Sequence, residues 1–329
     1  MENTKTRILR KLREREGFVS GQELCEELGI SRTAVWKYIR QLEAEGYRLE
    51  AVPNRGYCLR QVPDILSESE IQSRLHTRWV GQKVVCLAEV DSTNIRARRL
   101  AEEGAPSGTL VAADRQTKGR GSRGRSWESP AGESIYMTLL LRPEFSPASA
   151  SMLTLVMGLS AVQGMEQVTG AALQIKWPND VVLNGKKVVG ILTEMSAQVD
   201  YIDHLVIGVG VNVNGKEFPQ ELQDKATSLA AQLGKDFCRA GLAAAILEAF
   251  ERNYEIFCRT EDLSGLKEEY QRVLANAGKQ VRVLDPASPY SGLALGIDER
   301  GQLLVRREDG TVERVYAGEV SVRGLYSYV

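Results

Sequence analysis

Residues 119–127 have the sequence Gly119-Arg120-Gly121-Ser122-Arg123-Gly124-Arg125-Ser126-Trp127, in which three glycines are interspersed with three arginines. Such a stretch is unsuited to a packed helix or strand. Glycine leaves the backbone free to approach a ligand, and each arginine offers a planar guanidinium to phosphate or carboxylate. The stretch therefore predicts a loop that binds an anion. Two alternatives are a solvated surface loop and an arginine-glycine strip that follows single-stranded nucleic acid.

The segments on either side place this loop between two strands of a sheet. A strand is predicted over residues 109–114 and another over 134–141, and a largely buried helix is predicted over 149–168. A glycine-rich loop is a weak signal by itself, and its structural context decides its meaning. Because this loop connects strands and does not hang as a tail, the context favours a small-molecule phosphate site.

A polar tetrapeptide, Asp91-Ser92-Thr93-Asn94, lies between a predicted strand over residues 83–90 and a predicted helix over 95–103. Its side chains are well placed both to cap that helix and to hydrogen-bond a ligand. Capping alone is the more common use of these residue types, so the sequence favours it.

A predicted hairpin follows a strand over residues 173–176 and the stretch Lys176-Trp177-Pro178-Asn179-Asp180. Asn184-Gly185 separates two apolar β runs, which is a strong hairpin signal. This places Lys187 on a strand just beyond the turn, where an isolated lysine is usually a solubilising charge.

One more strand is predicted over residues 204–213. Gly208 and Gly210 within it indicate close approach by a neighbouring group or a ligand.

The first 62 residues have the pattern of a winged helix-turn-helix. Ser20 opens a Ser-x-x-Glu capping box, Gly29 makes a turn, and Ser31 caps a third helix. Two short β runs, 47–52 and 57–60, then form a predicted hairpin with Arg55 at its tip. An ordinary helical pair with a solvated basic face is the alternative. Trp36 is left unassigned between core and surface. The residues expected to reach DNA are Ser31, Arg32, Thr33, Lys37 and Arg55.

The charge distribution agrees with this interpretation. The 329 residues carry a net charge of −1, which argues against bulk electrostatic binding to nucleic acid or membrane. Residues 1–60, however, hold 12 Lys and Arg against 9 Asp and Glu. That asymmetry favours an N-terminus that faces nucleic acid.

The cysteine and histidine content bears on compartment and chemistry. Five cysteines without a CxxC pair fit a reducing compartment, and the two histidines give little support to a histidine-centred metal site or a Ser-His-Asp triad. The run from Met152 to Met165 is too short and too interrupted to span a bilayer, and no signal peptide precedes the charged N-terminus. We expect a cytoplasmic protein that does not bind membranes.

The chain as a whole predicts an α+β protein of three domains. A winged helix-turn-helix covers residues 1–62, a linker with Pro63 follows, and a ligand-binding domain covers 67–276 and ends in two helices predicted over 242–257 and 263–275. Short β runs alternate with glycine and aspartate turns over residues 277–329, which predicts a small barrel.

Together these motifs resemble the family of bifunctional biotin protein ligases and biotin-operon repressors. The resemblance covers essentially the whole chain. It implies a central class II synthetase-like biotin/lipoate ligase domain with a mixed sheet, flanked by the winged helix and an SH3-like C-terminal barrel. The stretches that carry it are Asp91 to Asn94, Gln116 with Gly119-Arg120-Gly121, Lys176 to Asp180, Gly185 to Gly190 around Lys187, and Gly208 to Asn212.

The resemblance also implies a reaction. Biotin and ATP would form biotinyl-5′-adenylate and pyrophosphate, and a lysine of the biotin carboxyl carrier protein of acetyl-CoA carboxylase would then attack the adenylate. Bringing a carboxylate onto an α-phosphate needs cations that stabilise the developing charge. By resemblance Lys187 lies between these two anions and Arg120 closes over the adenylate, with Mg²⁺ accompanying ATP and Asp180 as its candidate carboxylate.

The same resemblance assigns residues to the two substrates. The biotin set is Ser92, Thr93, Asn94, Gln116, Arg120, Gly121, Ser122 and Lys187. The ATP and adenylate set is Gly119, Arg123, Trp127, Lys176, Asn179, Asp180, Asn212 and Arg323.

The chain departs from the family at Ser122, where arginine is common. We expect the loop to retain the acyl-adenylate less tightly, because an Arg–phosphate contact is charge-assisted and a Ser contact is not.

The repressor role follows from the N-terminal pattern. The adenylate would order the loop and favour a homodimer, and two helix-turn-helix units would then match a two-fold operator DNA. The alternatives are a lipoate ligase, a ligand-sensing DNA-binding regulator without ligase activity, and an RNA-binding protein that uses the arginine-glycine loop.

Overall fold

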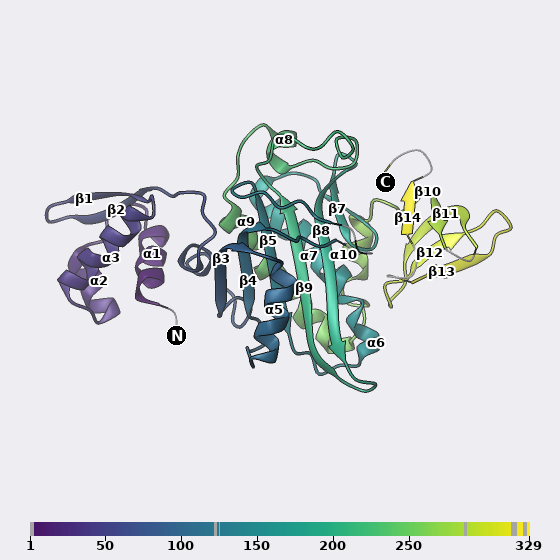
Figure 1. Cartoon of the computed structure of the whole chain (residues 1–329), viewed down its shortest axis with the longest axis horizontal. Coiled ribbons are helices and arrows are strands. Elements are labelled where there is room, and N and C mark those ends of the chain that lie inside the picture. The colour runs from purple at the N-terminus through teal and green to yellow at the C-terminus, as the bar shows by residue number, and fades with distance from the viewer. Residues whose placement is uncertain (1–2, 122–123, 125, 286–287, 317–320, 325–327) are drawn as a thin grey trace.

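The computed structural model describes the chain except residues 1–2, 122–123, 125, 286–287, 317–320 and 325–327, and of Ser321 and Arg323 it describes the backbone alone. Figure 1 shows three bodies in a row. The winged helix lies at one end, a large mixed sheet with its helices in the middle, and a small β domain at the other end.

The winged helix is built as predicted. Its elements are α1 (Thr4–Glu14), α2 (Gly21–Leu28), α3 (Arg32–Ala44), β1 (Arg48–Val52) and β2 (Gly56–Gln61). The Ser20 hydroxyl accepts a hydrogen bond from Glu23 N at 3.0 Å, and the Ser31 hydroxyl accepts one from Ala34 N at 3.2 Å, so both predicted caps are present. Gly29 ends α2 at φ 66°, a conformation that glycine adopts without strain.

A carboxylate joins the winged helix to the middle of the molecule. Glu70 on α4 (Glu68–Gln72) is fully buried, and it accepts hydrogen bonds from Arg13 on α1 and from the Tyr47 hydroxyl at 2.8 and 2.6 Å. Arg74 pairs with its other oxygen. Burial and the adjacent Glu70 charge raise the pKa of Tyr47 far above its usual value, so the phenol stays a hydrogen-bond donor.

The central sheet is mixed, as predicted, with strand order β3-β4-β5-β9-β8-β7-β6. β3 and β4 are parallel and every other pair is antiparallel. Its strands are β3 (Val84–Val90), β4 (Leu110–Gln116), β5 (Ser134–Leu141), β6 (Gln174–Lys176), β7 (Asp180–Leu183), β8 (Lys186–Ala197) and β9 (Ile202–Asn212).

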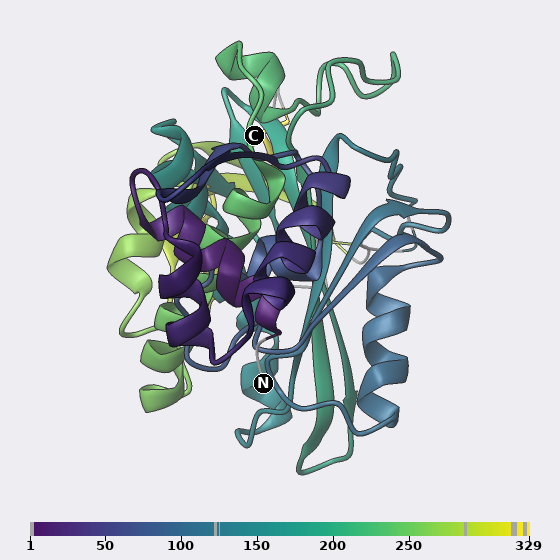
Figure 2. The ribbon, with the colours of Figure 1, turned by 90° about the vertical axis from the view of Figure 1, so that its left-hand side faces the viewer.

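Helices cover the two faces of this sheet unequally. α7 (Leu153–Thr169) and α9 (Arg239–Thr260) pack on one face and form the main core with it. α5 (Thr93–Glu102) packs on the other face, over Val111, Leu140 and Val206. Figure 2 shows blue α5 on one side of the sheet and the green helical segments on the other. The part of the second face that α5 leaves uncovered carries the candidate site.

Two predicted helices differ from the structure. The helix predicted over 149–168 is divided into α6 (Pro147–Ala150) and α7. The helix predicted over 263–275 is reduced to α10 (Lys267–Arg272), because residues 273–275 pair with β6 through Ile175 N to Val273 O at 2.7 Å and Ala275 N to Ile175 O at 2.8 Å. This pairing covers the edge of the sheet. A short helix, α8 (Leu229–Leu233), was not predicted.

By length and composition, Pro147–Thr169 is the one helical segment in the described part of the chain that could cross a membrane. It is longer than the apolar run in the sequence because it includes α6. Within this fold 72% of its most apolar window is buried, against α9 and the sheet. Burial of this kind is what a core helix of a folded domain requires.

The C-terminal body is an antiparallel sheet of order β13-β12-β11-β10-β14, in agreement with the predicted short strands. The Trp177 indole, 1% exposed, donates from Nε1 to Gly301 O at 3.0 Å and so ties this body to the centre. Its strands are β10 (Gln280–Leu284), β11 (Tyr290–Ile297), β12 (Leu303–Arg306), β13 (Val312–Val315) and β14 (Ser321–Gly324).

Candidate functional site

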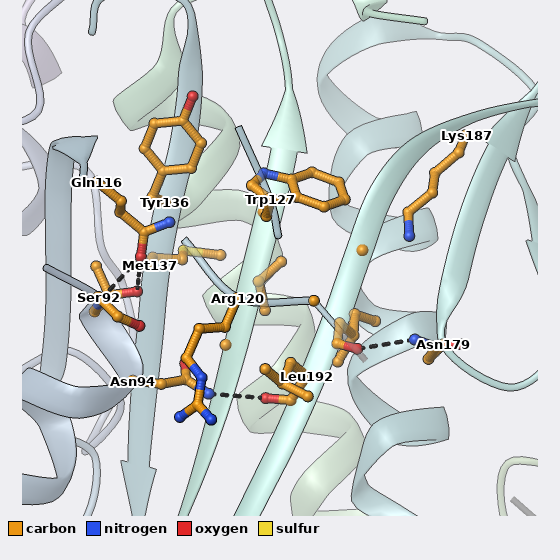
Figure 3. A pocket seen from close by; sticks show the side chains of 17 residues that line it. Ser92, Asn94, Gln116, Arg120, Trp127, Tyr136, Met137, Asn179, Lys187 and Leu192 are labelled. Carbon is orange, nitrogen blue, oxygen red and sulfur yellow. Dashed lines mark hydrogen bonds between the residues drawn. The ribbon is translucent and has the colours of Figure 1, made fainter. Parts of the chain in front are cut away.

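A small polar pocket lies on the sheet face beside the start of α5 (Figure 3). In Figure 3 the Trp127 ring lies between the Ser92 and Gln116 side of the pocket and the Lys187 and Asn179 side. The lining residues are Ser92, Thr93, Asn94, Gln116, Arg120, Gly121, Trp127, Tyr136, Met137, Asn179, Lys187, Gly190, Ile191, Leu192, Gly208, Val209 and Gly210.

At three positions on this face of the sheet, glycine leaves room for neighbouring side chains where a Cβ would not fit. A Cβ at Gly208 would lie 2.2 Å from Asn94 Oδ1, and a Cβ at Gly210 would lie 3.0 Å from the Trp127 ring. A Cβ at Gly190, on the neighbouring strand, would lie 2.8 Å from the same ring. The predicted close approach at Gly208 and Gly210 is therefore confirmed, and it comes from these side chains.

The tetrapeptide and Gln116 form one hydrogen-bonded group. Thr93 donates to Gln116 Oε1 from its backbone N at 2.9 Å and from its hydroxyl at 3.1 Å, and Gln116 Nε2 donates to the Ser129 hydroxyl at 3.0 Å. Thr138 Oγ1 on β5 lies 2.8 Å from Thr93 Oγ1. These contacts fix the first turn of α5 against the end of β4.

The expectation that the tetrapeptide serves for capping is wrong. Ser92 occupies the N-cap position of α5 but makes no side-chain capping hydrogen bond, and Asp91 Oδ1 accepts from Ser92 N at 2.7 Å. Ser92 is 2% exposed and lines the pocket. Because its hydroxyl is not used by the helix, it remains a pocket group.

Asn94 and Arg120 share a carboxylate that the sequence did not single out. Asn94 Nδ2 donates to Glu194 Oε2 at 2.8 Å, and Arg120 Nη1 lies 3.3 Å from Glu194 Oε1. Arg98 Nη1 is 3.9 Å from the same oxygen. Glu194 on β8 thus contacts two of the predicted biotin residues.

The base of the arginine-glycine loop is closed by backbone contacts. Trp127 N donates to Gly119 O at 2.9 Å, and Arg120 forms an isolated β-bridge with Ser126. A Cβ at Gly119 would lie 2.2 Å from Trp127 O, so only glycine fits there. Ser122 and Arg123 lie outside the described residues.

Lys187 is positioned by an irregularity in β8. Lys187 pairs with Val182 and Val189 with Val181, so Val188 is an extra residue in the ladder, a β-bulge. The backbone of Lys187 is held on its other side, donating to Lys225 O at 2.8 Å and accepting from Thr227 N at 2.9 Å. Its ammonium lies 5.0 Å from the centre of the Trp127 ring. Lys187 is therefore a site residue and not a surface charge.

A charged cluster surrounds Asp180, whose side chain is 10% exposed. Lys187 Nζ is 2.5 Å from Asp180 Oδ1, and Lys176 Nζ is 3.8 Å from Oδ2. The Tyr328 hydroxyl donates to Oδ2 at 2.5 Å. Two cations and a phenol thus offset one partly buried carboxylate.

A second, larger cleft adjoins the small pocket. The residues that line both are Gly121, Trp127, Tyr136, Asn179, Lys187, Ile191 and Leu192. The cleft has a volume of about 830 Å³ and the small pocket about 40 Å³. Ligand sites for small molecules usually need several hundred Å³. The cleft therefore has room for a nucleotide, whereas the small pocket must widen to accept a small-molecule ligand.

The remaining predicted nucleotide residues are spread around the cleft. Lys176, Asp180 and Asn212 line it, and Asn212 Nδ2 donates to Thr227 O at 3.1 Å. Asn179 Nδ2 donates to Ile191 O at 3.1 Å. Arg323 lies in β14, next to the cleft residue Val322, and its backbone pairs with that of Arg282 in β10. The side chain of Arg323 lies outside the described residues.

Four of the predicted DNA residues lie exposed at the start of α3, and the fifth, Arg55, lies on the β1–β2 hairpin. Arg32, Thr33 and Lys37 are exposed on α3, and Ser31 is exposed at its cap. Arg55 of the hairpin stacks 4.3 Å from the centre of the Phe18 ring. This arrangement gives a basic surface around the exposed face of α3.

The structure shows whether Trp36 belongs to the core or to the surface. It is 54% exposed on the same face, with the Arg40 guanidinium 5.4 Å from the centre of its ring. It therefore belongs to the surface and not to the core.

Several site residues were missed because their partners are far away in sequence. Glu194, Thr138, Tyr136, Ser129 and Tyr328 each contact the predicted residues or line the pockets. Alternation along the strands could have found two of them. Tyr136 and Thr138 pair with Gly210 and Gly208, so they share the face of those glycines.

Known families match all three parts of the chain. A model of the biotin/lipoate A/B protein ligase family matches residues 87–212, and a helix-turn-helix domain model matches residues 4–58. A model of the biotin protein ligase C-terminal domain matches residues 277–323.

Individual relatives match over nearly the full length. The bifunctional ligase/repressor BirA of Bacillus subtilis is 42% identical over 93% of this chain and 94% of its own. The protein of the same name from Escherichia coli is 31% identical over 93% of both chains. Among solved structures, the biotin protein ligase from Aquifex aeolicus in complex with biotin and ATP has a TM-score of 0.66 and 35% identity, covering 74% of this chain and 99% of that one.

Proposed function

The chain belongs to the biotin/lipoate A/B protein ligase family, and we propose that it is a bifunctional biotin ligase and biotin-operon repressor. Its N-terminal helix-turn-helix and C-terminal domain flank the ligase domain, and the chain aligns with 94% of the length of the bifunctional relative from Bacillus subtilis. A winged helix would serve the repressor function and the central site the ligase function.

The ligase reaction has two steps. A biotin carboxylate oxygen attacks the α-phosphorus of ATP, the bond to the bridging oxygen breaks, and pyrophosphate leaves. The unprotonated amine of a lysine on the biotin carboxyl carrier protein of acetyl-CoA carboxylase then attacks the acyl carbon of biotinyl-5′-AMP. AMP leaves as the amide forms, and the nitrogen releases one proton. Neither step needs a protein nucleophile, so the enzyme acts by orientation and charge stabilisation.

Lys187 at the junction of the two pockets is the observation that carries this proposal. It lines both the small pocket and the large cleft, and the carboxylate of Asp180 lies 2.5 Å from its ammonium. A cation at this junction can contact a carboxylate in one pocket and a phosphate in the other. Charge that develops between them in the transition state is stabilised there.

We assign biotin to the small pocket. Its ureido group needs a few fixed hydrogen-bond partners, which Ser92 and Thr93 at the start of α5 and Gln116 at the end of β4 provide. Arg120 and the loop would close over the bound acid after Arg120 leaves Glu194. The full proposed set is Ser92, Thr93, Asn94, Gln116, Arg120, Gly121, Ser122 and Lys187.

We assign ATP to the large cleft. Trp127 offers a ring to the nucleotide, and Lys176 adds positive charge near its phosphates. The full proposed set is Gly119, Arg123, Trp127, Lys176, Asn179, Asp180, Asn212 and Arg323.

Mg²⁺ would enter with ATP. No group of three His, Cys, Asp or Glu side chains within the described residues could hold a metal ion. A single carboxylate together with substrate phosphates is nevertheless the usual way in which proteins bind Mg²⁺ with a nucleotide, and Asp180 in the cleft fits that role. The ion would neutralise phosphate charge.

The repressor function would follow from the same ligand. Biotinyl-5′-AMP would order the arginine-glycine loop and favour a homodimer, whose two winged helices would bind a two-fold operator. Arg32, Thr33 and Lys37 would then face the DNA, with Ser31 and Arg55 near its backbone. The carrier protein of the ligase function and the operator DNA of the repressor function are both cytoplasmic partners, so we propose a cytoplasmic location.

Pyrophosphate release from ATP on addition of biotin tests the ligase function. We expect release with biotin and none with lipoate, and a loss of about 100-fold or more in Lys187→Ala, the magnitude typical of removing a charge-stabilising group. Lys186→Ala is the matched control, because the Lys186 ammonium points instead to Gln223 O at 2.8 Å. No release with either acid would favour a DNA-binding sensor, and release with lipoate alone would favour a lipoate ligase.

Operator binding tests the repressor function. DNA selected by the protein from a random duplex pool should bind more tightly when biotin and ATP are both present, and the dimer fraction should rise under the same conditions. Affinity that is the same with and without the two substrates would contradict the proposed role of the adenylate.

A further inference from the structure

Tyr328 follows β14 in the chain, and its side chain lies against the central sheet. It packs beside a small buried cluster of Val182, Ala275 and Val329, and it lines the large cleft. A residue from the C-terminal body is therefore part of the wall of the proposed nucleotide site.

Tyr328 touches two charged residues of that site with different parts of its side chain. The hydroxyl donates to Asp180 Oδ2 at 2.5 Å. The ring faces the Lys176 ammonium, which lies 3.7 Å from the ring centre. The first contact stabilises an anion, and the second stabilises a cation through the negative face of the ring.

Asp180 links the Tyr328 hydroxyl to Lys187. Asp180 binds Tyr328 with one oxygen and Lys187 with the other, the latter at 2.5 Å. The Asp180 side chain is only 10% exposed, so water compensates little of its charge. The strength with which Asp180 holds Lys187 therefore depends on what else compensates this carboxylate.

During adenylation Lys187 must turn from Asp180 toward the reacting carboxylate and phosphate. The Asp180 charge would then rest on the Tyr328 hydroxyl and Lys176 at Oδ2, and on the Mg²⁺ that would enter with ATP. Without the hydroxyl, Asp180 would hold Lys187 more firmly and withdraw it from the transition state.

Resting on the ligase function proposed above, we propose that Tyr328 is a positioning residue for adenylation. Its hydroxyl shares the charge of Asp180 so that Lys187 can serve the reacting anions, and its ring holds Lys176 at the nucleotide. The two parts of the side chain act on different kinetic constants, because Lys187 serves the transition state and Lys176 serves bound ATP.

Two substitutions in the full-length protein separate these effects. Tyr328→Phe removes the hydroxyl and keeps the ring. It should lower kcat for biotin-dependent pyrophosphate release about tenfold, as expected for one charge-assisted hydrogen bond, and leave KM for ATP unchanged. Tyr328→Leu also removes the ring and should in addition raise KM for ATP about threefold to tenfold. Tyr316→Phe, an exposed tyrosine in the same body, is the control and should match the parent.

A double substitution shows whether the effect passes through Asp180. When Asp180→Asn has removed the charge, Tyr328→Phe should have little further effect on kcat, so the two changes should be non-additive. Equal kcat for Tyr328→Phe and Tyr316→Phe, or full additivity with Asp180→Asn, would overturn the inference.

The proposed ligase function is tested separately by the parent protein and Lys187→Ala. Absence of biotin-dependent pyrophosphate release in the parent protein would contradict the proposed ligase function itself. If the parent releases pyrophosphate normally, Lys187→Ala loses this activity and Tyr328→Phe leaves it unchanged, only the proposed role of Tyr328 is contradicted. Thermal unfolding of every variant identifies a change in kcat that comes from misfolding.

Discussion

Arg239 at the start of α9 binds Asp64 of the linker that follows the winged helix. The Arg239 Nε donates to Asp64 Oδ2 at 2.9 Å, and the Arg239 backbone N donates to Asp64 Oδ1 at 2.8 Å. The same guanidinium donates from Nη1 to Asp114 Oδ1 at 2.6 Å. Asp114 lies on β4 two residues before Gln116, so one side chain joins the linker of the DNA-binding domain to the strand that carries the small pocket.

We expect Arg239→Met to lower the free energy of unfolding by about 3 kcal/mol. The substitution leaves two carboxylates without their cation, and breaking a buried ion pair commonly costs about 3–5 kcal/mol. The lower end applies because the Asp64 and Asp114 side chains keep about a third of their exposure. Urea denaturation measures the change. Arg78→Ala, at an ion pair whose arginine is 74% exposed, is the control and should cost less than about 1 kcal/mol.

Gly208→Ala should raise KM for biotin about tenfold. A Cβ there would lie 2.2 Å from Asn94 Oδ1, so Asn94 must move and lose its hydrogen bond to Glu194. Steady-state pyrophosphate release at varied biotin measures the effect. Gly158→Ala in α7 is the matched control, because a Cβ there meets its nearest atoms at 3.8 Å. An unchanged KM in Gly208→Ala would show that Asn94 has no part in binding biotin.

The stability of the protein should fall as the pH decreases below about 6.5, with His204 contributing to the fall. Burial, and then the charges of Arg142 and Arg98, lower the pKa of His204 in the folded protein. The unfolded chain therefore binds this proton more readily, so this contribution to stability rises with pH. His204→Asn should show a smaller loss of unfolding free energy between pH 7.5 and pH 5.5. An unchanged loss of unfolding free energy in His204→Asn over this pH range would contradict the role of His204.

Ser122→Arg should slow the dissociation of biotinyl-5′-AMP about fivefold to tenfold. An arginine at this position in the loop offers a charge-assisted hydrogen bond to phosphate, roughly twice as strong as the neutral bond of a serine hydroxyl. Release of labelled adenylate, chased with unlabelled biotin and ATP, gives the rate directly. Equal rates for the two proteins would mean that residue 122 does not contact the phosphate.

Local signals in the sequence predicted most of the elements correctly. Ser20, Ser31 and Asn184-Gly185 act within a few residues of themselves, and each cap and turn is present in the structure. The polar motifs also come together as a group around one face of the sheet, since strand order brings the ends of β4, β8 and β9 near each other.

The errors arise where distant parts of the chain meet. Ser92 does not cap its helix, and Thr93 beside it instead binds Gln116, 23 residues later. The helix expected to continue to residue 275 stops early because that segment pairs with β6. Tyr328 contacts Asp180 across 148 residues, a relation that no local pattern contains. Hydrophobic periodicity predicts elements, whereas these contacts depend on how the elements pack.

The extra residue Val188 in β8 determines on which face of the sheet the Lys187 side chain lies. Side chains alternate along a regular strand, so residues 187 and 190 would point to opposite faces. With the bulge, Lys187 lies over Gly190, where a Cβ would be 3.0 Å from its ammonium, while Val188 and Val189 are both fully buried. A deletion of Val188 would keep every charged residue of the site in the chain. It would nevertheless turn the ammonium of Lys187 toward the helical layer and leave the junction of the two pockets without a cation.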